Sequence, residues 1–338
     1  MNMANLKIGL AGNPNVGKTT LFNNLTGLNQ HVGNWPGKTV AQAKGHYKYN
    51  GNEVEVIDLP GNYALSAHSI EEIVSRDFIV DEDSDVIVNI IDAANIERNL
   101  YLTVQMMELG ANLVVALNMN KYAQDKGYTI DANKLSELLG VPVVEIEANR
   151  DIGKEELLKT IEHAAANPVN TTERLVYNNE LKEHIAELQA VIEEDKNLLD
   201  VPSSWIAIKL LENDEIIEEK IDGSSKRNNI VRETERVKNH LKGIFGEGSE
   251  EVIANARYAF IDGLLKESLT KPASPIESLS EKIDRIVTNR ILGFPIFILI
   301  MYTMFEIVFT VGAPFQDMID EFFGIDRKST RLNSSHAT

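Results

Sequence analysis

The chain has 338 residues, a formal net charge of −18 and no cysteine. This length allows two domains and a sizeable core. The negative charge argues against nucleic acid as the main partner, because phosphate backbones attract basic surfaces. The lack of cysteine excludes disulfides, thiolate metal sites and cysteine nucleophiles.

Strand-like and helix-like segments alternate from residue 6 to about 166. Near-continuous runs of valine, isoleucine and leucine are typical of strands buried on both faces, so we predict a doubly wound α/β fold with a mostly parallel sheet. The predicted strands are 6–11, 54–58, 86–92, 113–118 and 141–146, and the predicted helices between them include 99–109, 131–139 and 154–165.

One segment interrupts this alternation. Asn50-Gly51 separates two strand-like runs, 41–49 and 53–58, and this dipeptide is a strong signal for a β-hairpin. We therefore expect one antiparallel strand at an edge of the sheet.

The first predicted strand leads into G-N-P-N-V-G-K-T at 12–19, which fits the phosphate-binding pattern Gly, four residues, Gly-Lys-Ser/Thr. Main-chain N–H groups of such a loop and of the following helix face an anion. Lys18 is expected to reach the β- and γ-phosphates, and the Thr19 hydroxyl to bind Mg²⁺. The expected nucleotide-binding residues here are Gly12, Asn13, Pro14, Asn15, Val16, Gly17, Lys18 and Thr19.

Two later segments are candidates for sensing the terminal phosphate. Asp58 ends a strand before Leu59-Pro60-Gly61, which suits a carboxylate near Mg²⁺ and an N–H directed at the γ-phosphate. In the loop predicted at 32–40, Gly37-Lys38-Thr39 would close over the nucleotide, with the Thr39 hydroxyl on Mg²⁺. The alternative for Thr39 is that it merely starts the next strand. Lys18, Thr39 and Gly61 are the candidate catalytic residues of these motifs.

A base site is expected at the ends of two buried strands. Asn118 ends one strand and is followed by Met119 and Lys121, and Ala148 follows the next strand in the analogous place. Many guanine-binding proteins carry, three residues after such an Asn, an Asp that accepts the N1 and N2 hydrogens of guanine. Lys121 occupies that position here. A missing acceptor should cost about 1–3 kcal/mol or more of guanine preference, so we predict weaker or relaxed base choice.

The composition changes after residue 167. Helical patterns at 179–194, 204–212, 230–245 and 250–270 predict an all-α domain over 168–274. Region 275–325 combines an amphipathic helix at 280–290 with an apolar run at 291–311 that is long enough to span a bilayer. Lys282, Arg285 and Arg290 place its N-terminal side in the cytoplasm. A buried core helix is the alternative. Residues 326–338 continue no pattern, and we expect a non-native tail on a chain that is naturally longer.

Together these segments resemble the ferrous iron transport protein B family. The resemblance rests on the phosphate loop, on Val32-Gly33-Asn34-Trp35-Pro36-Gly37 with Thr39, on the turn after Asp58, and on runs at 97–102, 116–119, 205–211 and 282–287. It covers the chain to about Phe323. It implies a cytosolic P-loop GTPase domain at 1–167, a GDI-like helical domain at 168–274, and the first membrane helix of a prokaryotic Fe²⁺ transporter.

The resemblance also implies roles for individual residues. Asn15 would help to bind a K⁺ that speeds hydrolysis, and Glu71 and Glu72 would orient the attacking water. Carboxylates that favour a helix N-terminus are the alternative for this pair. The residue after Gly61 is Asn62 rather than a glutamine, so we predict slow, K⁺-stimulated GTP hydrolysis. The family's usual Thr-Ser-Ala reads Ile146-Glu147-Ala148 here.

The implied cofactors are GTP or GDP, Mg²⁺ and K⁺. The implied partners are the remaining transmembrane part, the transported Fe²⁺, the membrane and, as a further candidate, a second copy of the chain, with no nucleic acid. Residues 1 to about 285 would lie on the cytoplasmic side of the cell membrane.

Three alternatives stay open. A soluble GTPase of RNA modification or ribosome assembly shares the phosphate loop but should carry a basic RNA-binding domain. An ATP-hydrolysing partition or transport protein is compatible with Lys121. A membrane adaptor would bind nucleotide and change shape without hydrolysing it.

Overall fold

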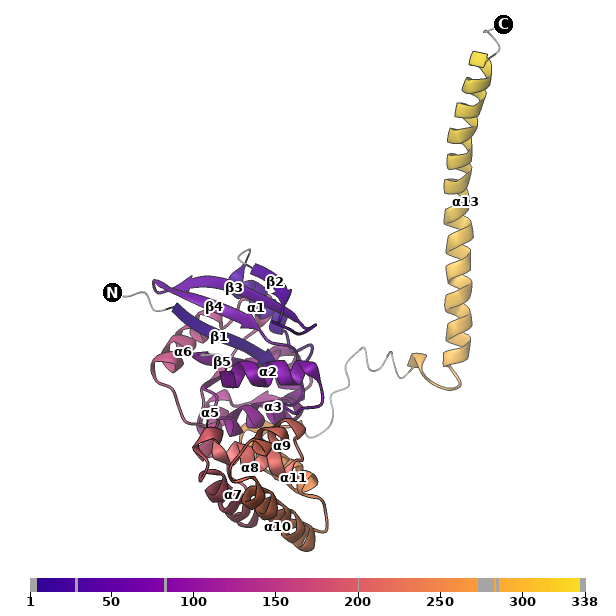
Figure 1. Cartoon of the computed structure of the whole chain (residues 1–338). Coiled ribbons are helices and arrows are strands. Elements are labelled where there is room, and N and C mark those ends of the chain that lie inside the picture. Colours follow the sequence, from indigo (N-terminus) through magenta and orange to yellow (C-terminus); the bar gives the residue numbers. More distant parts are fainter. Residues whose placement is uncertain are drawn as a thin grey trace. The chain divides into compact units, whose positions relative to one another are not determined.

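The computed structural model describes residues 5–27, 30–81, 84–199, 201–272, 283 and 286–334. The chain divides into a compact unit that ends at Pro275 and a second unit that begins at Ile276. The first unit contains the sheet and most of the helices, and the second contains one long helix (Figure 1).

A sheet in the order β2-β3-β4-β1-β5-β6-β8 forms the centre of the first unit. Strands β4, β1, β5, β6 and β8 run parallel, which confirms the doubly wound α/β class. The strands are β1 (Asn5–Gly12), β2 (Gln30–Asn34), β3 (Ala41–Tyr49), β4 (Asn52–Asp58), β5 (Val86–Asp92), β6 (Leu113–Asn118) and β8 (Val143–Glu145).

The antiparallel edge has one strand more than the sequence predicts. Strand β3 pairs antiparallel with β4, as the Asn50-Gly51 turn indicates, and β2 then pairs antiparallel with β3. The segment that contains β2 was expected to be a loop. Its residues lack a buried face, so no hydrophobic alternation marks it as a strand.

Helices cover both faces of the sheet (Figure 1). On one face α1 and α6 pack with Ile8 and Val56, and on the other α2, α3 and α5 pack with Ile57 and Ile91. Neighbouring strand residues thus belong to opposite cores, which explains the uninterrupted apolar runs. These helices are α1 (Lys18–Thr26), α2 (Ile70–Asp81), α3 (Ile96–Glu108), α5 (Ala132–Leu139) and α6 (Lys154–Ala166), and the short α4 (Asn120–Asp125) follows β6.

The helical region contains α7 (Asn179–Ile192), α8 (Ser203–Leu211), α9 (Glu215–Asp222), α10 (Arg227–Phe245) and α11 (Ser249–Ser268). The sequence predicts all of these except α9. It also misses the short pairing of β7 (Thr129–Ile130) with β9 (Leu269–Thr270), which ties the end of this region to the sheet domain. Buried side chains of α7, α8, α10 and α11 join the core on the α2 and α3 side, so the region packs directly against the sheet domain.

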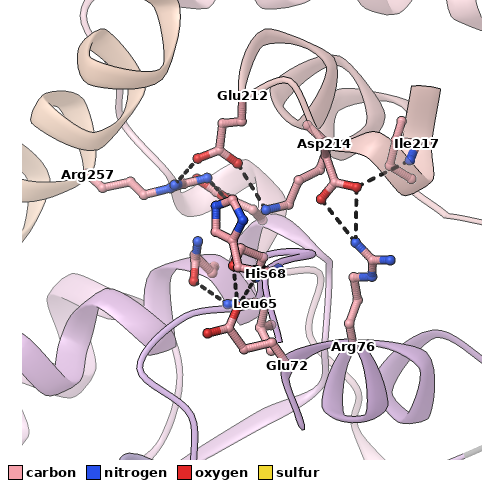
Figure 2. A network of polar contacts seen from close by, with 12 residues as sticks. Leu65, His68, Glu72, Arg76, Glu212, Asp214, Ile217 and Arg257 are labelled. Atoms are coloured by element: carbon pink, nitrogen blue, oxygen red, sulfur yellow. Dashed lines mark hydrogen bonds and ion pairs between the residues drawn. The ribbon is translucent and has the colours of Figure 1, made fainter. Parts of the chain in front are cut away.

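Buried ion pairs cross this junction (Figure 2). Arg76 of α2 lies 3.0 Å from Asp214 before α9, and both side chains are 3% exposed. Arg257 of α11 donates to both carboxylate oxygens of Glu108 at 2.8 Å and also to Glu212. Because a buried charge is costly without a partner, these pairs fix how the helical region meets the sheet domain.

The second unit is dominated by α13 (Gly293–Ser334). Its stretch Gly293–Thr310 has a mean hydropathy of 1.8 and is long and apolar enough to cross a membrane. This matches the predicted apolar run. The helix continues through most of the expected tail. Of the amphipathic helix predicted at 280–290, residues 280–282, 284 and 285 lie outside the described residues, and among the others 283, 286 and 287 are helical.

Candidate functional site

The phosphate loop lies between the end of β1 and the start of α1, as predicted. Asn15 and Gly17 have positive φ, at 66° and 93°, which turns the chain sharply before Lys18. A Cβ on Gly17 would lie 2.4 Å from Asn118 Nδ2, and one on Gly12 would lie 2.5 Å from the Ile90 carbonyl oxygen. Both glycines are therefore needed for close packing as well as for their backbone conformation.

An open cavity of about 570 Å³ lies over this loop. Its wall includes most of the predicted phosphate-binding residues, together with Thr20, which the sequence analysis did not single out. The predicted residues that line it are Asn13, Pro14, Asn15, Gly17, Lys18, Thr19, Gly61 and Met119. Val16 instead points into the core below α1, where it is 2% exposed.

Lys18 and Asp58 meet in this region. The Lys18 ammonium lies 2.5 Å from Asp58 Oδ1, and both side chains are largely buried. Burial raises the pKa of Asp58, and Lys18 opposes that shift only in part. The charged form of Asp58 therefore depends on a cationic neighbour.

One wall of the cavity carries an unused donor. Asn13 is 3% exposed, and its amide Nδ2 has no hydrogen-bond partner among the described residues. A buried amide without a partner is costly in a folded protein, so its position beside the cavity suits a ligand that accepts hydrogen bonds.

The turn after β4 is fixed to the phosphate loop. Leu59 N donates to Leu10 O at 3.0 Å, and Asn62 N donates to Gly12 O at 3.2 Å. The Asn62 side chain is buried and donates to Ser75 Oγ at 2.6 Å and to Glu71 O at 3.1 Å. Asn62 therefore joins this turn to α2, a role that the sequence analysis missed, and its amide is already engaged.

The loop with Gly37, Lys38 and Thr39 does not line the cavity in the described part of the chain. Thr39 is exposed, and Lys38 lies 2.8 Å from Asp77 of α2. Trp35 anchors the loop through its buried ring, which packs edge-on against Phe78 at 5.8 Å. The sequence identifies the loop, but in this conformation the exposed Thr39 is not among the residues that line the phosphate cavity.

The two glutamates of α2 differ in their surroundings. Glu72 accepts hydrogen bonds from the Ser66 backbone N–H, at 3.3 Å, and from the Ser66 hydroxyl. Leu65 in the same segment donates to Gln105 of α3 at 2.7 Å, and Figure 2 shows Leu65 and Glu72 close together. Glu72 thus closes the loop before α2, whereas Glu71 is exposed in the first turn.

A second cavity, of about 450 Å³, adjoins the first and shares Gly17, Thr20 and Met119 with it. Asn118 connects the two sites, because its amide donates to Val16 O at 2.8 Å and accepts from Ala148 N at 3.1 Å. The predicted base residues Asn118, Met119, Lys121 and Ala148 all line this cavity.

Glu147 is a cavity residue that the sequence analysis noted only as a departure from the family pattern. One of its carboxylate oxygens accepts from the Lys121 backbone N–H at 2.8 Å. A carboxylate therefore lies beside the position where the expected aspartate is replaced by Lys121. Tyr122 and Arg150 also line this cavity and were not predicted.

Comparison with known proteins identifies the family. The family model for ferrous iron transport protein B matches residues 6–161, and the model for the FeoB cytosolic helical domain matches residues 177–270. The chain belongs to the ferrous iron transport protein B family. This confirms the resemblance from the sequence motifs.

Curated FeoB relatives are longer than this chain. The Fe(2+) transporter FeoB of Methanocaldococcus jannaschii is 41% identical over 322 residues, which cover 95% of this chain and 48% of the relative. The FeoB of Escherichia coli is 36% identical over 325 residues, covering 94% of this chain and 40% of the relative. The chain thus spans about half or less of the length of these FeoB proteins.

Solved FeoB structures correspond to the first unit. A point variant of S. thermophilus NFeoB bound to mGDP is 38% identical with a TM-score of 0.72, and covers 78% of this chain and 100% of that one. The cytosolic domain of the T. maritima FeoB iron transporter in apo form is 29% identical with a TM-score of 0.67, and covers 79% and 100%.

Proposed function

We propose that this chain is the GTP-binding and GTP-hydrolysing cytosolic part of a prokaryotic Fe²⁺ transporter, joined to its first membrane-spanning helix. The observation that carries the proposal is the pair of adjoining cavities, one over the phosphate loop and one at the ends of β6 and β8. A nucleoside diphosphate or triphosphate has matching parts, an anionic chain and a planar base. The GDP-bound FeoB relatives support this assignment.

The residues of the phosphate cavity fit a magnesium-bound triphosphate. The loop N–H groups, the unpartnered Asn13 amide and Lys18 supply donors for phosphate oxygens. Thr19 and Asp58 would hold Mg²⁺, which neutralises the developing charge when bound. With nucleotide bound, Lys18 would contact the phosphates instead of Asp58. Mg²⁺ would then be the cation beside Asp58.

A K⁺ site at Asn15 rests on the position of that residue in the same cavity wall and on its left-handed backbone. A monovalent cation there would supply the positive charge that other phosphoryl-transfer enzymes obtain from an arginine. Since the Asn62 amide is engaged by α2, we propose that Asn62 does not orient water and that intrinsic turnover is slow. Exposed Glu71 is the better placed of the two glutamates to act through water, because Glu72 is engaged by Ser66.

Base selectivity has a candidate acceptor in Glu147. Guanine offers N1 and N2 hydrogens on its Watson–Crick edge, and these require a carboxylate in the base cavity. One Glu147 oxygen is fixed by Lys121 N–H, and we propose that the second accepts from guanine. Glu147, which follows β8, would then take the role of the aspartate that is missing after β6. This would preserve a preference for GTP over ATP.

The candidate for membrane attachment is α13, whose stretch Gly293–Thr310 has the length and mean hydropathy of a membrane-spanning helix. We propose that this stretch spans the cell membrane with residues 1 to about 285 on the cytoplasmic side, and that the remaining transmembrane part conducts Fe²⁺. The match to the FeoB helical domain, and the acidic charge, disfavour the alternative of a soluble RNA-associated GTPase.

The proposal is tested by phosphate release from residues 1–275 with Mg²⁺ and either GTP or ATP, in K⁺ and in Na⁺. We expect slow GTP hydrolysis that K⁺ accelerates, a weaker reaction with ATP, and loss of the acceleration in Asn15→Ala. Faster hydrolysis of ATP would overturn the guanine assignment. Binding of GTP without any phosphate release would favour the non-hydrolysing adaptor.

A further inference from the structure

Two histidines and a glutamate gather on the helical region, away from the nucleotide cavities. Glu180 and His184 lie one turn apart on α7, and His240 lies on α10. Their candidate ligand atoms all lie within 4.8 Å of one another. The helices are held together beside this cluster by the shared apolar core, which includes Leu181 and Val237.

The distances in this cluster suit metal coordination. Glu180 Oε1 lies 3.4 Å from His184 Nε2 and 3.5 Å from His240 Nε2. Ligand atoms at about 2.0–2.1 Å from a tetrahedral metal are about 3.3–3.4 Å apart. The two imidazole rings meet edge-on with centroids 4.8 Å apart. His240 is half exposed and can adjust its ring, whereas His184 is held in place.

His184 is oriented by a second carboxylate. Its ring is 6% exposed, and Nδ1 lies 2.9 Å from Glu187 Oε2. Glu187 is also paired with Arg236 of α10, so it acts as an acceptor and His184 Nδ1 must be the donor. With the proton on Nδ1, an uncharged ring would have its Nε2 lone pair on the side of Glu180 and His240. A carboxylate behind a histidine is the usual support of a metal-binding imidazole.

His184 Nε2 is the unexplained atom of the cluster. It is buried and has no hydrogen-bond partner of acceptable geometry among the described residues. An ion pair among the three side chains would need a protonated histidine whose Nε2–H points at Glu180, and the geometry does not provide that hydrogen bond. A metal ion would use the lone pairs of both rings and the charge of Glu180 together.

We propose that Glu180, His184 and His240 bind a divalent transition-metal ion of the borderline class, such as Zn²⁺, Co²⁺ or Fe²⁺. Such ions bind two imidazole nitrogens and one carboxylate oxygen more strongly than Mg²⁺ or Ca²⁺ do. Three protein ligands leave a fourth position for water. The ion links α7 to α10 and stabilises the helical region by mass action. The site stands independently of the function proposed for the nucleotide cavities.

The test uses metal-free residues 1–275, the part that matches separately solved FeoB cytosolic domains. Co²⁺ is titrated and its visible absorption recorded, followed by competition with Zn²⁺ and with excess Mg²⁺. We expect one Co²⁺ per chain with the absorption of a four- or five-coordinate ion, displaced by Zn²⁺ and retained in Mg²⁺. We also expect Zn²⁺ to raise the melting temperature.

The variants decide which residues bind. We expect His240→Ala and Glu180→Gln, which change exposed or half-exposed side chains, to weaken Co²⁺ binding at least tenfold, and His163→Ala on α6 to leave it unchanged. All three variants should keep the far-UV circular dichroism spectrum of the native protein, which shows that they are folded without relying on the nucleotide proposal. Absence of Co²⁺ binding, or equal binding in His240→Ala and the native protein, would overturn the site.

Discussion

At the scale of single residues, the nucleotide site depends on side chains that connect loops from distant parts of the sequence. Asn118 joins the phosphate loop to the strand end that carries Ala148, and Gly17 has room for no side chain beside it. The Glu147 carboxylate likewise accepts from the Lys121 N–H and so connects the segments that follow β8 and β6. The spacing of Asn118 and Ala148 could be predicted because they follow buried parallel strands. The contact of Glu147 could not, because it depends on how two loops meet.

Replacement of Glu147 tests the base acceptor. In Glu147→Gln one of the two acceptor oxygens becomes an NH2 donor, so we expect the affinity for GDP to fall about tenfold or more while that for ADP changes little. Competition against a fluorescent nucleotide measures both affinities. Glu145→Gln, an exposed position at the end of β8 two residues before Glu147, is the matched control. An unchanged ratio of GDP to ADP affinity would remove Glu147 from base recognition.

At the scale of elements, α2 links the nucleotide site to the helical region. Its N-terminal side meets Asn62 and Ser66 near the phosphate cavity, and its Arg76 pairs with Asp214, whose carboxylate also accepts from Ile217 N at the start of α9. The sequence predicts four of the helices but not α9, because α9 is short and rich in charge. It is held by its cap and by the ion pair with α2 as much as by its own apolar residues.

The ion pair between Arg76 and Asp214 should be important for stability. Arg76→Met leaves Asp214 buried without a charged partner, so we expect the free energy of unfolding to fall by about 3–5 kcal/mol. The double variant Arg76→Met with Asp214→Asn should recover much of this loss. Urea denaturation of residues 1–275 measures both. A change within about 0.5 kcal/mol in the single variant would show that the pair is not important.

Glu212 makes stability depend on acid pH. Although burial raises its pKa, Arg257 and Lys209 dominate and lower it from 4.5 to about 2. A carboxyl with a lowered pKa contributes stability that is complete above about pH 4.5 and is lost as pH falls toward 2. We therefore expect the unfolding free energy of Glu212→Gln to vary less with pH in this window than that of the native protein.

The control for this measurement is Glu219→Gln, an exposed position on α9. It should keep the pH dependence of the native protein. Equal slopes for the native protein and Glu212→Gln between pH 4.5 and 2 would contradict the pairing of Glu212 with Arg257.

At the scale of the whole molecule, the sequence predicts the fold class well. It predicts less well the short strand pairings and the packing of the helical region against the sheet domain. Long runs of buried residues define β1, β5 and β6, and the Asn50-Gly51 turn defines the hairpin. Strand β2 and the pairing of β7 with β9 are short and lack apolar alternation, so pairing with neighbours rather than local pattern creates them. The core shared by the sheet and the helical region likewise depends on tertiary packing.

The membrane assignment of α13 predicts a difference between two lengths of the chain. The full chain should float with lipid vesicles in a density gradient and resist extraction by high salt and carbonate, because Gly293–Thr310 is long and, apart from Glu306, largely apolar. Residues 1–275 should remain at the bottom of the gradient. Recovery of the full chain in the soluble fraction without detergent would contradict a spanning helix.

The account as a whole depends on guanine nucleotide binding by the phosphate loop. The most direct test is calorimetric titration of residues 1–275 with GDP and Mg²⁺, for the native protein and for Lys18→Ala, with Lys48→Ala, at an exposed position of β3, as control. Loss of a charge-assisted contact to phosphate should weaken GDP binding by about a hundredfold in Lys18→Ala and leave Lys48→Ala unaffected. If the native protein binds no GDP, or if Lys18→Ala binds it equally well, the central claim is wrong.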